Sequence, residues 1–217
     1  MVPEPLPSTE HVYPPEFFRR QDESDDGVFY RDPRLLVHID GPAIEAVGHY
    51  LRQALPEGAT ILDLMSSWRS HFPQGFSKKA LVGLGLNEVE LAENPQLDER
   101  VVHDINREPE LPFEDERFDA AIVTVSIQYI THPLETFHEV RRVVRPGAAF
   151  HVIYSNRMFP TKAVAVWQNL DGRQRAELIG SYFTNCGGWS PPKAVDASPD
   201  SSAYTDPIFV VYAHRLG

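Results

Sequence analysis

Cysteine, long apolar runs and positive charge are all scarce in this chain. Its 217 residues include one cysteine, Cys186, so no disulfide can form within the chain and no oxidising compartment is needed. We expect Cys186 to be an ordinary thiol in a loop. No apolar run approaches the roughly 18 residues that span a bilayer, and Met1–Pro5 lack the basic and apolar regions of a secretory signal. These absences favour a cytoplasmic protein.

Acidic residues outnumber basic ones. Lys and Arg number 20 against 31 Asp and Glu, which gives a formal net charge of −11. A surface field of this sign repels nucleic acids and anionic membranes, because those partners bind clustered Lys and Arg. We therefore expect a small-molecule substrate, no nucleic-acid or membrane partner, no metal, and a monomer or homodimer.

The first 40 residues differ in composition from the rest. Prolines recur between residues 3 and 15, and an acidic run extends from Asp22 to Asp26. Such a composition cannot build a core alone. We expect a partly irregular arm over residues 1–40, a candidate lid, followed by one domain over residues 41–217.

From residue 41 onward, helical and strand patterns alternate. Buried strands are predicted at 59–64, 80–86, 101–103, 118–126 and 148–154, with a last strand at 208–213 that residues 193–196 join. Helices are predicted at 41–55, shortly after Ser67, at 134–144, near 162–168 and at 172–183. Strands that alternate with helices imply parallel strands joined by right-handed crossovers. The pattern indicates a doubly wound α/β fold, whose ligands bind beyond the carboxyl ends of the strands.

Segment 111–147 resembles a known family. Leu111-Pro112-Phe113 and Phe118-Asp119 introduce a strand, Ser126–Ile130 follow it, and Glu139–Gly147 end the next helix with Arg-Pro-Gly. This order resembles the class I S-adenosylmethionine-dependent methyltransferases of the type 11 group. The resemblance implies a Rossmann-like, mostly parallel seven-stranded sheet with an antiparallel last strand, and S-adenosylmethionine as the cofactor.

The resemblance also implies a first cofactor loop, which departs here from the family pattern. The family has an acidic residue followed by a glycine-rich loop, whose bare backbone lets the cofactor approach. Asp63 matches the acidic position, but Met65, Ser67 and Arg69 stand where the glycines would be. Ser66 and Ser67 are expected to offer hydroxyls and amides to the cofactor carboxylate, with Arg69 pairing with it. Alternatively, the two serines only cap a short helix.

Two further cofactor positions follow from the resemblance. The ribose-binding carboxylate at the end of the second strand is missing, because its position falls on Gly85. Either Asn87 or Glu88 replaces it, or water and backbone hold the ribose; Asn87 fits equally well as a helix N-cap. Asp104 matches the residue that accepts from the adenine amine, and the amide of Ile105 matches the donor to the ring.

The remaining candidates concern methyl transfer itself, an in-line displacement that mainly requires orientation. The resemblance places Ser126 and Tyr129 near the sulfonium, where an aromatic ring attracts a delocalised cation. Tyr129 and His132 are the predicted catalytic residues, and His71 and His38 are alternative bases.

Substrate contacts are expected from two segments. Asn156 and Arg157 follow a buried strand at the edge of the predicted cleft, and Arg157 suggests an acidic or carbonyl group on the substrate. A turn with a helix cap at Thr161 is the alternative. From the arm, Tyr30 is expected to contact the substrate if the arm acts as a lid.

The function that these expectations favour is methyl transfer from S-adenosylmethionine to a small-molecule acceptor by in-line displacement. The alternative is a catalytically silent binding or regulatory protein on the same fold, because two customary cofactor features are replaced. A nicotinamide-dependent oxidoreductase is disfavoured, since no Gly-x-Gly-x-x-Gly follows the first strand.

Overall fold

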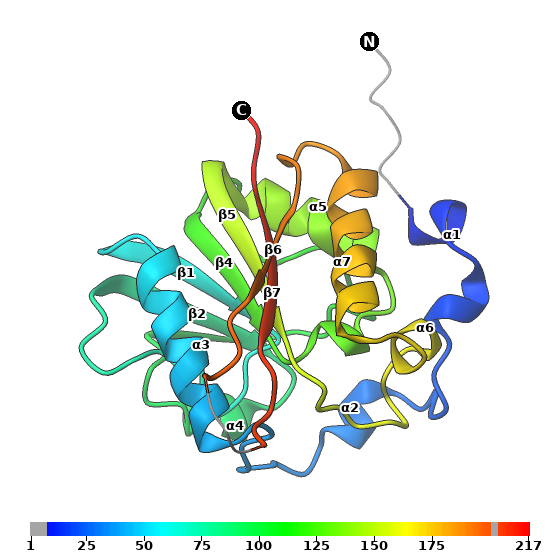
Figure 1. Cartoon of the computed structure of the whole chain (residues 1–217), viewed down its shortest axis with the longest axis horizontal. Coiled ribbons are helices and arrows are strands. Elements are labelled where there is room, and N and C mark those ends of the chain that lie inside the picture. Colours follow the sequence, from blue (N-terminus) through cyan, green and yellow to red (C-terminus); the bar gives the residue numbers. More distant parts are fainter. Residues whose placement is uncertain (1–7, 201–203) are drawn as a thin grey trace.

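A single seven-stranded sheet forms the centre of the computed structural model, which describes residues 8–200 and 204–217 (Figure 1). The strands are β1 (Ala59–Leu64), β2 (Lys78–Gly85), β3 (Glu99–Val102), β4 (Phe118–Thr124), β5 (Val144–Tyr154), β6 (Lys193–Asp196) and β7 (Phe209–His214). Their order is β3-β2-β1-β4-β5-β7-β6. Strands β1 to β5 are parallel, β7 is antiparallel to β5, and β6 is antiparallel to β7. The predicted Rossmann-like fold is confirmed, and the winding direction reverses between β1 and β4.

Helices cover both faces of the sheet. One face carries α3 (Gly41–Ala54), and the other carries α5 (Pro133–Val143) and α7 (Gly172–Cys186), which pack against each other (Figure 1). Shorter elements complete the described chain: α1 (Thr9–Val12), η1 (Pro15–Phe18), α2 (Asp26–Phe29), α4 (Glu88–Ala92), η2 (Ile127–Tyr129) and α6 (Ala165–Gln168).

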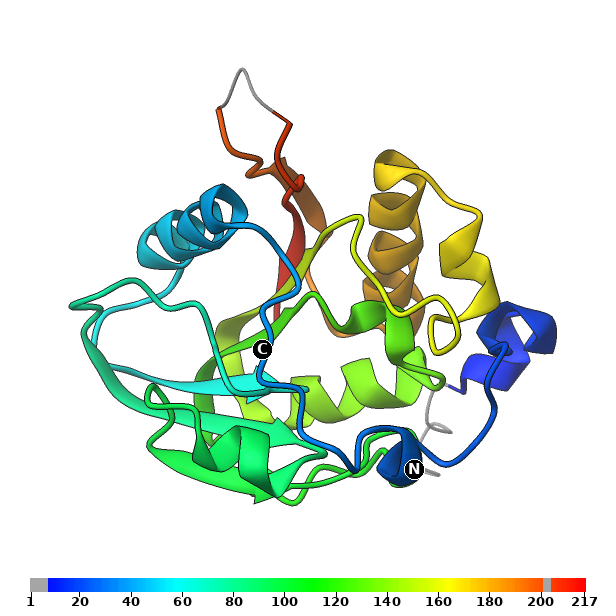
Figure 2. The same cartoon turned by 90° about the horizontal axis from the view of Figure 1, so that it is seen from below.

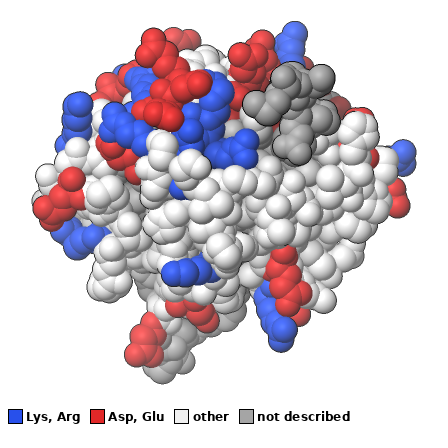
Figure 3. All heavy atoms as spheres, turned by 90° about the horizontal axis from the view of Figure 1, so that it is seen from above, with Lys and Arg blue, Asp and Glu red and all other residues white. Residues whose placement is uncertain are grey.

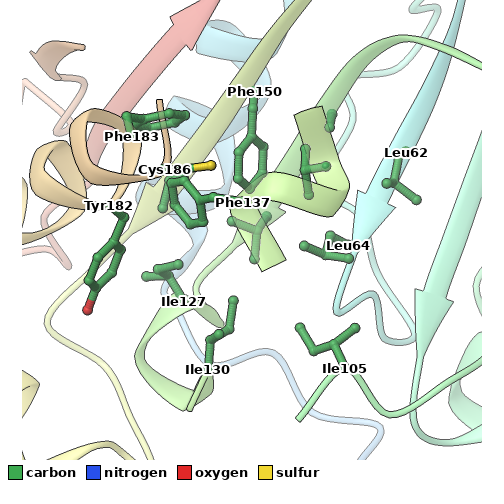
Figure 4. Packing of buried hydrophobic residues seen from close by; sticks show 14 of the residues in the cluster. Leu62, Leu64, Ile105, Ile127, Ile130, Phe137, Phe150, Tyr182, Phe183 and Cys186 are labelled. Carbon is green, nitrogen blue, oxygen red and sulfur yellow. The ribbon is translucent and has the colours of Figure 1, made fainter. Parts of the chain in front are cut away.

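Strand alternation divides the core into two clusters. Within β1, Ile61 contributes to the cluster beneath α3, whereas Leu62 and Leu64 face the cluster beneath α5 and α7. This division follows from the two-residue period of a strand. The second cluster is rich in aromatic rings: Phe137 of α5 lies edge-on to Phe183 of α7, with ring centroids 4.7 Å apart (Figure 4).

Local capping explains where the long helices begin. Asp40 accepts a hydrogen bond from the amide of Ala43 at 2.9 Å, and Asp171 forms a capping box with Gln174 at the start of α7. Helix α7 continues beyond its predicted end and includes Cys186, which is buried rather than in a loop. Burial raises the pKa of this thiol to about 11, so it is unreactive at neutral pH.

The predicted helix after Ser67 is absent. Residues 65–77 contain no helix, and the chain instead crosses from β1 to β2 as an irregular loop. Pro73 and Gly75 interrupt helical geometry, and Phe72 and Phe76 pack against each other with centroids 5.3 Å apart in the cluster beneath α3. Aromatic side chains of a loop therefore cover the part of the sheet where a crossover helix was expected.

The arm crosses the end of the molecule where the parallel strands terminate. Figure 2 looks at this end and shows the segment between α2 and α3 running across it. The arm is anchored at its start by Thr9, whose amide and hydroxyl donate to the carboxylate of Glu135, and Phe18 enters the core.

The opposite end of the molecule carries charges of both signs. Lys and Arg lie among Asp and Glu there (Figure 3), and Arg142 and Arg215 each pair with a carboxylate. Across residues 8–200 and 204–217, no helix is long and apolar enough to cross a membrane.

Candidate active site

A cavity of about 370 Å³ lies between the arm and the carboxyl ends of the strands. The loops that follow β1, β2, β3 and β4 line it, and Tyr30, Arg34 and His38 of the arm close it. This volume and position are typical of a small-molecule site in a doubly wound sheet.

The cavity brings together most of the predicted site residues. From the predicted cofactor set, it is lined by Met65, Ser66, Ser67, Asn87, Asp104, Ile105 and Ser126. From the predicted catalytic and substrate sets, it is lined by Tyr30, Tyr129 and Arg157.

Four predicted residues lie outside this lining. Asp63 lines a smaller neighbouring pocket of about 70 Å³, whereas Gly85, His132 and Asn156 line neither pocket. The ring of His132 is hydrogen-bonded to the hydroxyl of Thr131 at 2.9 Å. His132 and Asn156 therefore lie away from the cavity in this structure, because the chain turns after η2 and after β5.

Asp63 organises the first loop. Its Oδ2 accepts hydrogen bonds from the hydroxyls of Ser66 at 2.7 Å and Ser70 at 2.6 Å. The side chain is almost fully buried, and this burial raises its pKa to about 6 even though both serines favour the carboxylate. Ser66 thus binds the acidic residue itself instead of capping a helix.

The glycine-poor loop and the missing β2 carboxylate have one common structural cause. The amide of Ser66 donates to the carbonyl of Leu84 at 2.7 Å, which holds the loop against the end of β2. A Cβ at Gly85 would lie 2.2 Å from the carbonyl oxygen of Ser66. An acidic side chain at position 85 is therefore incompatible with this loop path. Met65 enters the loop with a φ of 55°, a left-handed conformation that costs a non-glycine residue about 1 kcal/mol.

Asn87 is occupied by structural hydrogen bonds. Its Oδ1 accepts from the amide of Glu90 at 3.0 Å and caps α4, while its Nδ2 donates to the carbonyls of Tyr30 at 2.8 Å and Arg31 at 3.1 Å. Asn87 therefore joins α4 to the arm. Glu90, at the third position of α4, lines the cavity and supplies it with a carboxylate that the end of β2 does not provide.

The loop after β3 is rigidly braced. Asp104 Oδ1 accepts from the amide of Asn106 at 3.0 Å. Asn106 in turn donates from Nδ2 to Asp26 and to the carbonyl of Tyr129, both at 2.9 Å. The predicted adenine position is thus fixed to the arm and to η2 by one amide side chain.

The candidate bases differ in their surroundings. Tyr129 accepts a hydrogen bond from the amide of Phe159 at 2.7 Å, and burial raises the pKa of its phenol. Burial lowers the pKa of His71 to about 4, and burial likewise lowers the pKa of His38. His38 lines both the cavity and the smaller pocket, so it is the histidine at their junction.

Several lining residues were not predicted from the sequence. They include Asp26, Glu90, Met158 and Phe159. The helical pattern after Asn87 could have indicated Glu90, because residue N3 of a capped helix lies beside its cap. No sequence signal places Arg34 beside Phe159, since this contact depends on the path of the arm.

Residues 71–152 match the family model for a methyltransferase domain. The matched segment extends from the first loop almost to the end of β5 and includes the Asp104 and Ser126 positions that line the cavity. Over this segment the chain is similar to the methyltransferase domain family, and its sheet has the Rossmann-like fold of the class I enzymes. No curated protein sequence matches the chain.

Solved structures of this methyltransferase fold resemble the chain at low sequence identity. One is a methyltransferase from Aquifex aeolicus, with 16% identity, a TM-score of 0.56, and coverage of 88% of this chain and 97% of that one. Another is phosphoethanolamine N-methyltransferase 2 from Haemonchus contortus in complex with S-adenosyl-L-methionine, with 12% identity, a TM-score of 0.57, and coverage of 84% and 54%. A third, the (4+2)-cyclase SpnF, has 13% identity, a TM-score of 0.58, and coverage of 88% and 92%. At these identities the likeness shows the fold.

The cavity presents polar and aromatic groups that fit an adenosine with a charged tail. It presents carboxylates at Glu90 and Asp104, serine hydroxyls at the first loop and an aromatic ring at Tyr129. Neither Met65 nor Trp68 fills it: Met65 only lines the cavity, and Trp68 is hydrogen-bonded to the carbonyl of Leu36 at 2.9 Å. The described residues contain no cluster of three or more His, Cys, Asp or Glu that could hold a metal ion.

Proposed function

We propose that this chain transfers a methyl group from S-adenosylmethionine to a small-molecule acceptor. The observation that supports this most strongly is the arm-covered cavity, which joins the loops after β1, β3 and β4 in one lining. The cover limits the size of an acceptor, and the net charge of −11 disfavours a nucleic acid.

The proposed roles divide along the cavity. Asp104 and the amide of Ile105 would hold the adenine. Oδ1 of Asp104 already accepts from the amides of Asn106 and Arg107, whereas Oδ2 accepts no hydrogen bond from the described residues and is open to the adenine amine. The hydroxyl oxygens of Ser66 and Ser67, whose protons are donated to Asp63 and Glu90, would accept from the ammonium of the amino-acid tail. Glu90 would receive the ribose hydroxyls on the lone pairs that Arg34 and Ser67 leave open. When bound, the cofactor supplies a methyl group on a sulfonium. The chain then orients the acceptor and excludes water, an effect worth on the order of 7 to 11 kcal/mol at best.

His38 and Tyr129 are the proposed residues beside the reacting groups. Tyr129 would present its ring to the sulfonium, since its hydroxyl already accepts the Phe159 amide. His38 would receive a proton from the acceptor, because its lowered pKa keeps the ring neutral at pH 7.

Calorimetry with S-adenosylmethionine and S-adenosylhomocysteine tests the cofactor site. We expect both to bind with one-to-one stoichiometry, and Glu90→Gln to weaken binding about tenfold, because an amide cannot accept on both sides as the carboxylate does. Glu88→Gln is the matched control, because Glu88 is exposed on the same helix and does not line the cavity. A loss with Glu88→Gln but not with Glu90→Gln would contradict the proposed ribose contact.

Transfer of a tritiated methyl group into metabolite extracts tests turnover. Labelling of a small molecule supports the proposed function. Cofactor binding without labelling of any fraction would instead favour a silent binding protein. That second candidate draws support from Met65 and Asn87, which replace features of the usual cofactor loops.

A further inference from the structure

Arg34 holds a partly unsatisfied guanidinium at the cavity. Its central carbon lies 4.3 Å from the centroid of Phe29, 5.3 Å from that of Tyr30 and 5.4 Å from that of Phe159. Nη2 donates to the carbonyl of Phe29 at 2.9 Å, but Nη1 is buried and has no hydrogen-bond partner among the described residues. A buried donor without a partner is costly, and its presence beside a cavity points to a ligand acceptor.

The other cations around the cavity already have carboxylate partners. Arg157, the second arginine in the lining, donates to Asp206 at 2.7 Å. Lys162 and Arg20 both bind Asp26, at 3.1 and 2.7 Å. Within the described residues, Arg34 has no such ion pair. Of the cations around this cavity, Arg34 is therefore the one whose charge is available to a negatively charged ligand.

The Glu90 carboxylate accepts no hydrogen bond from the guanidinium of Arg34. Glu90 Oε1 accepts from the backbone amide of Arg34 at 2.6 Å, and Oε2 accepts from the hydroxyl of Ser67 at 2.6 Å. The contact between Arg34 and Glu90 thus fixes the arm, while the side chain of Arg34 is held by aromatic rings.

The position of Arg34 assigns it to the acceptor rather than to the cofactor tail. Its ring contacts come from the arm and from Phe159, which follows β5. The proposed holders of the cofactor tail, Ser66 and Ser67, follow β1 and also line the smaller pocket. Apolar walls at Met158 and Phe159 complete the β5 side of the cavity.

We propose that Arg34 Nη1 binds a carboxylate or phosphate on the methyl acceptor, so that the substrate is a small organic acid with an apolar body. This inference rests on the proposed methyltransferase function. A guanidinium matches both anions geometrically, and its contacts with three aromatic rings hold it in place without an internal counter-ion.

Calorimetry on the S-adenosylhomocysteine complex tests the proposal, with benzoate and phenyl phosphate as probes and benzamide as the neutral probe. We expect at least one acid to bind, with benzamide binding more weakly. Arg34→Met should weaken acid binding about 10- to 100-fold, and Arg34→Lys should restore part of it. Arg31→Met is the matched control, because it removes the same charge from the same arm at an exposed position outside the cavity lining. Comparison of the two acids identifies which anion is preferred.

Three results would overturn the proposal. The first is that neither acid binds the wild-type complex. The second is that Arg31→Met weakens acid binding as much as Arg34→Met does. The third is that Arg34→Met weakens the binding of S-adenosylhomocysteine as strongly as the binding of the acids. Failure of S-adenosylhomocysteine to bind the wild type is a different result, which contradicts the proposed function alone. The same acid titrations on the free protein then still decide the role of Arg34.

Discussion

Among single residues, Asp63 combines almost complete burial with a raised pKa. Its pKa is about 6 in the folded protein, because burial outweighs the hydrogen bonds from Ser70 and Ser66, whereas the ordinary value is 3.8. The folded state therefore binds the proton more tightly than the unfolded state. The stabilisation is complete below pH 3.8 and is lost as the pH rises through about 6.

Asp63→Asn should remove this pH dependence. We expect the free energy of unfolding of the wild type, relative to the variant, to fall by about 2 kcal/mol between pH 4 and pH 7. Urea unfolding at several pH values measures it. Asp98→Asn is a control of opposite sign: burial of Asp98 is outweighed by hydrogen bonds from Lys78 and the Leu81 amide, which lower its pKa. Parallel pH profiles for wild type and Asp63→Asn would contradict the assignment.

At the scale of elements, the junction between β2 and the first loop depends on the missing side chain of Gly85. Gly85→Ala would place a Cβ 2.2 Å from the Ser66 carbonyl oxygen, and backbone cannot yield as a flexible side chain does. We expect the variant to lose about 1 to 3 kcal/mol of unfolding free energy. Because the shift displaces Ser66 and Ser67, S-adenosylhomocysteine should also bind more weakly. Thermal unfolding and calorimetry measure both effects.

Gly180→Ala is the matched control for this substitution. Gly180 lies inside α7, where an added Cβ would meet only Pro192 at 3.5 Å, an ordinary contact. Alanine at this position should stabilise the helix by up to about 1 kcal/mol. Equal unfolding free energies for the two alanine variants would show that Ser66 does not approach Gly85 closely enough to exclude a Cβ.

The elements that the sequence predicted well are those with a strong local period. Strands at 59–64 and 193–196 match the prediction residue for residue, and α3 begins at the predicted residue, Gly41. The prediction of a helix after Ser67 was wrong because Phe72 and Phe76 pack into the cluster beneath α3, and this packing determines the path of the loop. Local propensity says nothing about such long-range burial.

The candidate site was predictable where it follows strand ends and obscure where it depends on the arm. Asp104 and Ser126 come directly after β3 and β4, so the topology alone brings them to the cavity. Arg34 and Asp26 reach the same cavity only through the fold of the arm. Asn87 shows the converse, since its capping role was foreseen as an alternative and its bonds to the arm were not.

At the scale of the whole molecule, buried charges hold the arm over the cavity. Asp26 of α2 accepts from Arg20 at 2.7 Å and lies 3.1 Å from Lys162, whose side chain is fully buried. Burial alone would raise the pKa of Asp26, but hydrogen bonds from Arg20, Asn106 and Lys162 outweigh it and hold the pKa below its usual value. Lys162 also donates to the carbonyl of Ser24 at 2.5 Å. One carboxylate thus connects the arm to the segment after β5 and to the loop after β3.

Asp26→Asn should release the arm while the sheet stays folded. The substitution removes the nearest counter-charge of the buried Lys162 and of Arg20 and leaves only Asp22 and Glu23, each at 3.6 Å. Breaking a buried pair costs about 3 to 5 kcal/mol, and the remaining carboxylates place this case at the lower end. Because the cost falls on the docking of the arm, hydrogen exchange should accelerate in residues 20–37 and stay slow in β1, β4 and β5. Glu16→Gln is the control, since it removes an exposed charge from the same arm. Unchanged exchange in the arm, or equal acceleration throughout the chain, would show that Asp26 does not act as the arm's anchor.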